Sequence, residues 1–286
     1  MNEDKTIDTL VDDIYGLFQA PHQANPDNVE RFARLLSDIV SSRLAEDRDN
    51  QVATLRMSSL GKPDRQQWYD HNHPESKEQL AANTRIKFLY GDIIEALMLF
   101  LAAEAGHKVE QEQVTVEVNG VVGHNDAVID GHVVDVKSAS TYSFQKFKDG
   151  SLRENDPFGY MEQIAGYSAG LGGLPGAFLA VDKTLGHITL MQVPLDELQA
   201  INIPERIDHI KEVIANPEPP ERCYEPVEDG KSGNLKLDTG CSYCSHKFHC
   251  WADANDGIGL RTFIYSSGPR HLVNVGKEPQ VPEVTF

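Results

Sequence analysis

The sequence predicts a mixed α/β fold with helices packed on a central sheet. Residues 84–105 form a long apolar segment with helical spacing, and residues 112–138 read as a β-meander with two sharp turns. Residues 157–215 then follow the order helix, strand, strand, helix. Alternation of this kind is typical of helices covering a sheet. With 286 residues, 40% of them hydrophobic, the chain can bury a sizeable core.

The N-terminal part has its own helical pattern. Residues 6–20 and 27–45 have helical periodicity, and Asn25-Pro26 separates them as a break. We expect an acidic helical arm here. The sequence of these helices alone does not disclose their function.

The remaining elements are delimited by turn residues. Asn119-Gly120 and Asp130-Gly131 are strong signals for two-residue hairpin turns. The expected strands are 112–118, 121–129, 132–138, 176–182 and 187–193, and the expected later helices are 157–170 and 203–215.

The second hairpin sets a register that gathers polar groups. If Asp130-Gly131 is the turn, Asp126 faces Asp135 and His124 faces Lys137 across the strands. All four side chains then share one face, because side chains alternate along a strand. The other face takes the apolar residues Ala127, Ile129, Val134 and Val136.

Two carboxylates facing each other repel, and a divalent cation turns that repulsion into a binding site. Lys137 would hold a phosphate or an attacking water there. The alternative is an ordinary Asp-x-Lys on a solvated strand. Glu95 is a carboxylate on a largely apolar helical face, which is costly unless paired or metal-bound. Its alternative is a carboxylate at the edge of the apolar stripe.

The helix at 157–170 adds one more polar face. Gln163 and Tyr167 are four residues apart, and Tyr160 lies on the same side. Such a face could orient the lysine or contact a nucleotide by hydrogen bonding and stacking. An ordinary helix surface is the alternative.

Together these residues resemble the PD-(D/E)xK nuclease superfamily, in its RecB-like exonuclease branch. The motifs occur in the family's order over about residues 57–250: Gly91-x-x-x-Glu95, Asp126, Asp135-Val136-Lys137 and Gln163-x-x-x-Tyr167. The resemblance implies a restriction-endonuclease-like core over 57–215, after an arm at 1–56 and before a cysteine-containing segment at 216–286. It also implies Mg²⁺ or Mn²⁺ bound by Glu95, Asp126, Asp135 and the Val136 carbonyl, with Lys137 orienting the nucleophilic water.

The four cysteines lie close together in the sequence, as Cys223 and the run Cys241-x2-Cys244-x5-Cys250. Reduced thiolates are soft ligands that suit an iron–sulfur cluster or zinc. The run resembles the iron–sulfur RecB-like nucleases, including CRISPR-associated and phage enzymes, and this resemblance favours [4Fe–4S] over Zn²⁺.

The fourth ligand stays open. Relatives often place a cysteine where this chain has Asp64, so Cys223 is the preferred candidate and Asp64 the other. His246 and His249 could substitute if the metal is zinc. A zinc module in a protein without nuclease chemistry is a further reading.

The net charge, 26 − 44 = −18, argues against non-specific nucleic-acid binding over the whole surface. Basic residues are needed only along a DNA path, and the candidates for DNA contact are Lys62, Arg65, Lys146 and Tyr160. Scattered solvated charges are the alternative.

No stretch has the apolar length of a membrane span, so we expect an intracellular protein. The resemblance implies the cytoplasm of a bacterial or phage-infected cell. It also leaves two roles open for the N-terminal arm, namely docking a replication or recombination partner and covering a DNA channel. The expected activity is metal-dependent DNA hydrolysis, as an exonuclease rather than an endonuclease, processing ends in replication or recombination. The alternative is a catalytically silent nuclease-like protein that binds DNA or a partner.

Overall fold

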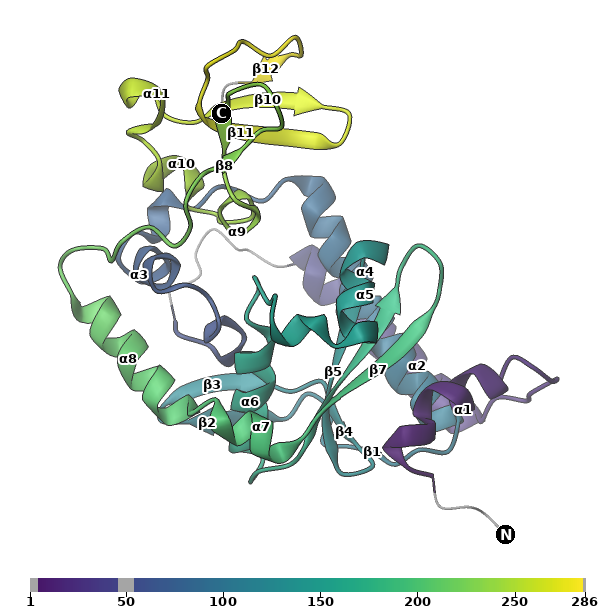
Figure 1. Cartoon of the computed structure of the whole chain (residues 1–286). Helices are drawn as coiled ribbons and strands as arrows, with labels where there is room; N and C mark the ends of the chain where they lie inside the picture. Colours follow the sequence, from purple (N-terminus) through teal and green to yellow (C-terminus); the bar gives the residue numbers. More distant parts are fainter. Residues whose placement is uncertain (1–4, 46–53, 285–286) are drawn as a thin grey trace. The chain divides into compact units, whose positions relative to one another are not determined.

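The computed structural model describes residues 5–45 and 54–284, and the chain divides into two compact units (Figure 1). Unit 1 comprises Met1–Gly61 and Leu80–Ile207, and unit 2 comprises Lys62–Gln79 and Asp208–Phe286. These bounds differ from the predicted segments 1–56, 57–215 and 216–286. The physical reason is that residues 62–79 pack with residues after 207.

Unit 1 is built on a five-stranded mixed sheet in the order β1-β4-β5-β6-β7. Strands β5 and β6 are parallel, and the other neighbours are antiparallel. This is the central mixed sheet that the sequence predicts. The strands are β1 (Val109–Glu110), β4 (Ala127–Ile129), β5 (His132–Ala139), β6 (Gly176–Asp182) and β7 (Ile188–Val193).

Helices cover both faces of this sheet. Helix α4 (Ala82–Glu104) and α1 (Leu10–Gly16) join one apolar core with alternate residues of β4, β5 and β6. On the other face, Phe178 of β6 contacts Phe147 of α5 and Tyr160 of α6. The other helices and short 3-10 turns are α5 (Thr141–Asp149), α6 (Tyr160–Gly170), α7 (Leu195–Ala200), η1 (Ile7–Thr9), η2 (Met57–Ser59) and η4 (Ser151–Arg153). The β5 residues that point to the α4 core are Val134 and Val136, as predicted.

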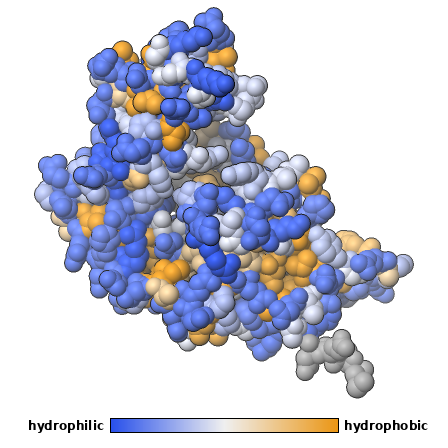
Figure 2. Space-filling model, in the orientation of Figure 1, coloured by the Kyte–Doolittle hydropathy of each residue, from blue (hydrophilic) through white to orange (hydrophobic). Residues whose placement is uncertain are grey.

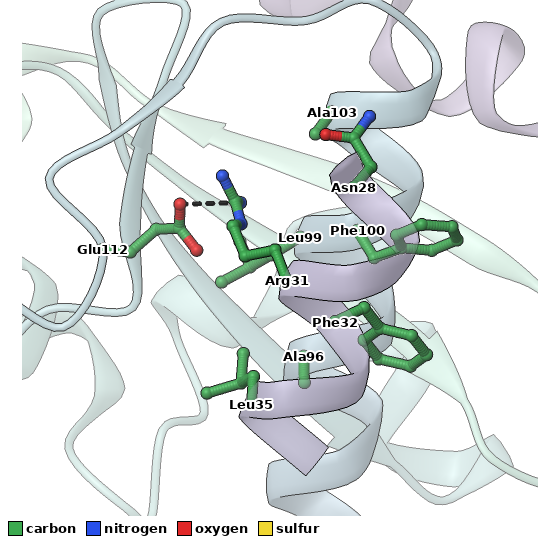
Figure 3. Close-up of a pocket in the computed structure, with 9 residues that line it drawn as sticks. All are labelled: Asn28, Arg31, Phe32, Leu35, Ala96, Leu99, Phe100, Ala103 and Glu112. Carbon is green, nitrogen blue, oxygen red and sulfur yellow. Dashed lines mark ion pairs between the residues drawn. The ribbon is translucent and has the colours of Figure 1, made fainter. Parts of the chain in front are cut away.

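The N-terminal helix α2 (Pro26–Ala45) packs along α4 (Figure 3). The rings of Phe32 and Phe100 stack with centroids 4.9 Å apart. Glu104 at the end of α4 accepts hydrogen bonds from the Asn25 backbone and the Asn28 side chain. The predicted arm therefore belongs to unit 1, and its first helix, predicted over 6–20, is only seven residues long.

The Asp130-Gly131 turn forms as predicted, with Ile129 paired to His132. Both turn residues have positive φ, +48° and +80°, which this tight hairpin requires.

The predicted strand over 121–129 is interrupted, and one pairing is wrong. Residues Val121–His124 form β3, which pairs with β2 (Thr115–Val118) in a separate two-stranded sheet. His124 faces Thr115 there, so it does not face Lys137. The reason is Asn125, whose side chain donates to the Gln111 carbonyl and turns the chain before β4.

Unit 2 combines an early segment with a late one. Helix α3 (Asp64–Asn72) is held to the end of α8 (Ile203–Ala215), where Trp68 Nε1 donates to the Asn216 carbonyl at 2.7 Å and Asn72 to the Ile214 carbonyl at 3.0 Å. A five-stranded antiparallel sheet in the order β12-β10-β11-β9-β8 completes the unit. The strands of this sheet are β8 (Val227–Glu228), β9 (Leu235–Lys236), β10 (Arg261–Tyr265), β11 (Gly268–Asn274) and β12 (Glu283–Val284). Unit 2 also contains η3 (Pro74–Ser76), α9 (Thr239–Ser242), α10 (Lys247–Cys250) and α11 (Ala254–Gly257).

One histidine makes unit 2 sensitive to acid. His271 is 7% exposed and shares a 2.8 Å hydrogen bond with Thr262. Burial, reinforced by the charge of Lys247 and opposed by Glu78, lowers the pKa of His271 to about 4 from 6.5. The unfolded chain thus binds the proton more readily. The stabilisation that depends on a neutral His271 is fully present above pH 6.5, and it is lost as the pH falls from 6.5 through about 4.

We therefore expect unit 2 to lose up to about 3 kcal/mol of stability between those pH values. Substitution of His271→Gln should flatten that part of the pH dependence. Thermal melts of both proteins from pH 7 to pH 4 check this, and equal slopes would contradict it.

No helix in the described ranges is long and apolar enough to cross a membrane. Hydrophilic residues cover most of the face drawn in Figure 2, with hydrophobic ones in small groups between them.

Candidate active site

The centre of the candidate site is the Asp135–Lys137 pair on β5. Asp135 is 1% exposed, and its Oδ2 lies 2.6 Å from Nζ of Lys137. Both side chains leave the sheet on the α6 face because Val136 between them packs into the α4 core. The carboxylate of the buried Asp135 and the ammonium of the half-buried Lys137 thus form an ion pair on this face of the sheet.

Asp126 joins this pair from the end of β4. The ladder between β4 and β5 stops at Ala127, and Oδ2 of Asp126 accepts a 2.7 Å hydrogen bond from the backbone N–H of Val136. Burial and the charges of Asp135 and Glu95 raise the pKa of Asp126 well above its usual value. The predicted convergence of Asp126 on Asp135 therefore occurs outside the regular ladder.

Glu95 approaches from α4. Its Oε1 accepts a 2.5 Å hydrogen bond from Nε2 of Gln113. Burial, together with the charges of Asp135 and Asp92, raises the pKa of Glu95 to about 7. The pKa of Asp135 is also raised by burial, although Lys137 opposes the rise. Carboxyl groups this close together disfavour ionisation because their negative charges would repel. A positive charge placed among them would favour their ionised forms.

Helix α6 supplies the bridge predicted for Gln163 and Tyr167. The Gln163 amide accepts from Nζ of Lys137 and donates to Oδ1 of Asp135, each at 3.3 Å. It also lies 3.0 Å from the hydroxyl of Tyr167, whose pKa is raised by burial. Gln163 therefore bridges the side chains of Asp135 and Lys137 on β5.

Lys137 stays an ammonium in this setting. Burial works to lower its pKa, but the charges of Asp135, Tyr160 and Asp126 outweigh burial and raise the pKa above its usual value. Nζ also lies 4.2 Å from the ring centroid of Tyr160. A permanent cation at this position suits a phosphate better than it suits proton abstraction.

The donor set fits a hard divalent cation, since all three side chains offer carboxylate oxygens. Within the described residues, however, no group of three or more His, Cys, Asp or Glu side chains could hold a metal ion as it stands. Lys137 occupies one oxygen of Asp135.

In unit 2, all four cysteines line one pocket of about 20 Å³, together with Arg65 and Tyr69. None is in a disulfide. Burial raises the pKa of Cys223, that of Cys241 to about 12 and that of Cys244 to about 11. The four thiols therefore share one pocket within unit 2.

The other predicted cluster ligands lie as follows. Cys223 lines the pocket with the other cysteines, whereas Asp64 pairs with His209 at 2.6 Å. His246 uses both ring nitrogens, towards Asp70 and Ser76, and His249 packs against Tyr69. The geometry therefore favours Cys223 as the fourth thiol.

The predicted DNA-contacting residues are divided between the two units. Lys62 pairs with Asp70 at 2.9 Å, and Arg65 donates to the Pro220 carbonyl and to Sγ of Cys250, so both serve unit 2. Lys146 binds the Asn155 side chain at 2.9 Å. Of this set, Tyr160 is the one in contact with Lys137.

Two site residues escaped the sequence analysis. Gln113 lies in a polar loop without any motif, and only folding brings it to Glu95. Asp156 accepts hydrogen bonds from the Gly159 and Met161 backbone at the start of α6, and its charge helps raise the pKa of Asp135. Asp156-Pro157 is a turn-initiation signal that could have drawn attention to it.

No family model matches the sequence, and no curated protein matches it. Among solved structures, the chain has distant similarity to two exonucleases. The alkaline exonuclease from Laribacter hongkongensis is 14% identical, with 62% of this chain and 94% of that one covered and a TM-score of 0.34. The phage-related exonuclease from Haemophilus somnus 129PT is 15% identical, with 58% and 95% covered and a TM-score of 0.41.

Proposed function

We propose that the chain is a metal-dependent deoxyribonuclease of the PD-(D/E)xK type, acting as an exonuclease on DNA ends in replication or recombination. The supporting observation is the grouping of the buried Asp135 with the half-buried carboxylates of Glu95 and Asp126, with Lys137 paired to Asp135. Mutually repelling carboxylates beside a fixed ammonium are costly for folding, and a cation and a phosphate would stabilise them.

Mg²⁺ or Mn²⁺ would be held by Glu95, Asp126, Asp135 and the carbonyl of Val136. When bound, the metal supplies a lowered pKa for its water and neutralises charge on the phosphate. The carboxylates provide the oxygen ligands that such ions prefer.

The chain's own residues then orient the reaction. Lys137 binds a phosphate oxygen or the attacking water through its ammonium. Gln163 holds Lys137 and Asp135 in place, and Tyr167 fixes Gln163 in turn. Tyr160 shields the ammonium from solvent with its ring and lies where a nucleotide could stack.

The cysteine pocket is proposed as a second, structural metal site. Cys223, Cys241, Cys244 and Cys250 would hold a [4Fe–4S] cluster, with Zn²⁺ as the alternative. Bound metal would lower the thiol pKa values that burial raises. We expect anaerobically purified protein to contain iron and sulfide and to absorb visible light. Cys241→Ser should lower both metal content and melting temperature, and a protein with zinc alone would select the alternative.

The function is tested with end-labelled linear DNA, single- and double-stranded, beside a closed circle. We expect degradation of linear DNA with Mg²⁺ or Mn²⁺, and none with EDTA or in Asp135→Ala. Cutting of the circle would change the reaction to endonucleolytic. A folded, metal-loaded protein that cleaves nothing would overturn the proposal in favour of a silent DNA- or partner-binding protein.

A further inference from the structure

The loop between β1 and β2 contacts two of the three carboxylate residues at once. Gln113 donates from its side chain to Oε1 of Glu95 at 2.5 Å. Its backbone N–H donates to the carbonyl of Asp126 at 3.2 Å. Gln113 thus connects helix α4 to the end of β4, the two elements whose separation sets the distance between Glu95 and Asp126.

This loop is held in an unusual conformation. Gln111 and Gln113 have φ values of +49° and +50°, where a side chain costs about 1–2 kcal/mol. Asn125 holds the loop by donating from its side chain to the Gln111 carbonyl at 2.9 Å and from its backbone to the Val114 carbonyl at 3.3 Å. Backbone strain of this kind persists only where surrounding contacts enforce it.

Helix α2 provides one of those contacts and also binds α4 near Glu95. Arg31 pairs with Glu112, next to Gln113, at 2.7 Å (Figure 3). Arg43 binds Asp92, which lies one helical turn before Glu95, with Nη2 donating to Oδ1 at 2.7 Å. Two arginines of one helix therefore bind carboxylates on either side of Glu95, one through the loop and one through α4.

We infer that Gln113 is a positioning residue for Glu95, and that α2 is a structural part of the proposed metal site through Arg31 and Glu112. The inference rests on the proposed function. A hydrogen bond to one carboxylate oxygen orients the other oxygen towards a metal, and removal of such a partner typically costs about 10–100-fold in metal affinity. The N-terminal helix then supports the active site instead of serving as a docking arm.

The test measures the affinity for Mn²⁺ in the absence of DNA. The electron paramagnetic resonance signal of free Mn²⁺ reports how much of the ion stays unbound. Gln113→Met keeps the shape of the side chain without its donor, and we expect at least about tenfold weaker binding. Gln111→Met is the matched control, in the same loop and at nearly the same φ, and it should bind as the wild type does. Asp135→Ala should lose Mn²⁺ binding at this site, so the difference between this variant and the wild type measures the site-specific binding.

The ion pair is tested by charge exchange. Arg31→Glu should weaken Mn²⁺ binding a few-fold, and the double exchange Arg31→Glu with Glu112→Arg should restore it. The exchange pair also tests the inference if Gln113→Met fails to fold. Wild-type affinity in both Gln113→Met and Arg31→Glu, with loss in Asp135→Ala, would overturn this inference alone. Absence of site-specific Mn²⁺ binding in the wild type would overturn it and the proposed metal site together.

Discussion

Substitution of Asp126→Asn is expected to lower DNA cleavage by roughly three orders of magnitude and to raise the melting temperature of the metal-free protein. The amide oxygen still accepts the hydrogen bond of the Val136 N–H, so the chain end of β4 stays in place. The negative charge that Asp135 and Glu95 oppose disappears. Relief of functional strain of this kind commonly stabilises by about 0.5–2 kcal/mol.

The metal dependence of the melting temperature distinguishes this explanation from a general stabilisation. Mg²⁺ or Mn²⁺ should raise the melting temperature of the wild type, because the folded state alone binds the ion. It should raise that of Asp126→Asn much less. A variant that is less stable than the wild type in EDTA, or that cleaves DNA normally, would show that Asp126 is not part of a strained site.

Substitution of Gly159→Ala should cause one of the largest losses of stability in unit 1. Gly159 precedes α6 with a φ of +72°, and a Cβ there would overlap Cα of Gly61. Backbone strain costs about 1–2 kcal/mol and a forced overlap about 1–3 kcal/mol more, so we expect a loss of about 3 kcal/mol or more. Denaturant unfolding measures it.

Gly172→Ala is the matched control for the strain alone. Gly172 has a φ of +84°, and no atom beyond its chain neighbours lies within 4 Å of the position that a Cβ would take. It should lose only about 1–2 kcal/mol. Equal losses at the two positions would mean that the close approach of Gly61 and Gly159 is not needed. Gly159→Ala should also lower the rate of DNA cleavage, because the helix that follows Gly159, α6, carries Gln163 and Tyr167.

Much of the fold could be predicted because its signals are local. Strand 176–182 and helix 203–215 have the predicted bounds, and Asp130-Gly131 forms the predicted turn. Turn residues and periodic apolar positions act over a few residues, so the sequence displays them directly. The break at Asn125 was not predictable in this way, since it depends on the Gln111 carbonyl fourteen residues earlier.

The candidate site likewise contains residues that local patterns predict and residues that only long-range contacts bring in. Asp126, Asp135 and Lys137 could be brought together from the pattern of one hairpin, although His124 was wrongly included because β3 pairs with β2. Gln163 was placed by helical spacing, and its contacts with Lys137 and Asp135 accord with the predicted role. Gln113, Arg31 and Arg43 could not be found, because their partners are distant in sequence and ion pairs have no local signature.

The discontinuity of unit 2 has a consequence for biosynthesis. Residues 62–79 emerge from the ribosome long before residues 208–286, with which they pack. Until then the ring of Trp68, which is buried in the finished protein, has no permanent partner in that later segment. A nascent chain in this condition is a substrate for chaperones. The cysteines belong to the same later segment, so any metal they bind would be inserted only after that segment is translated.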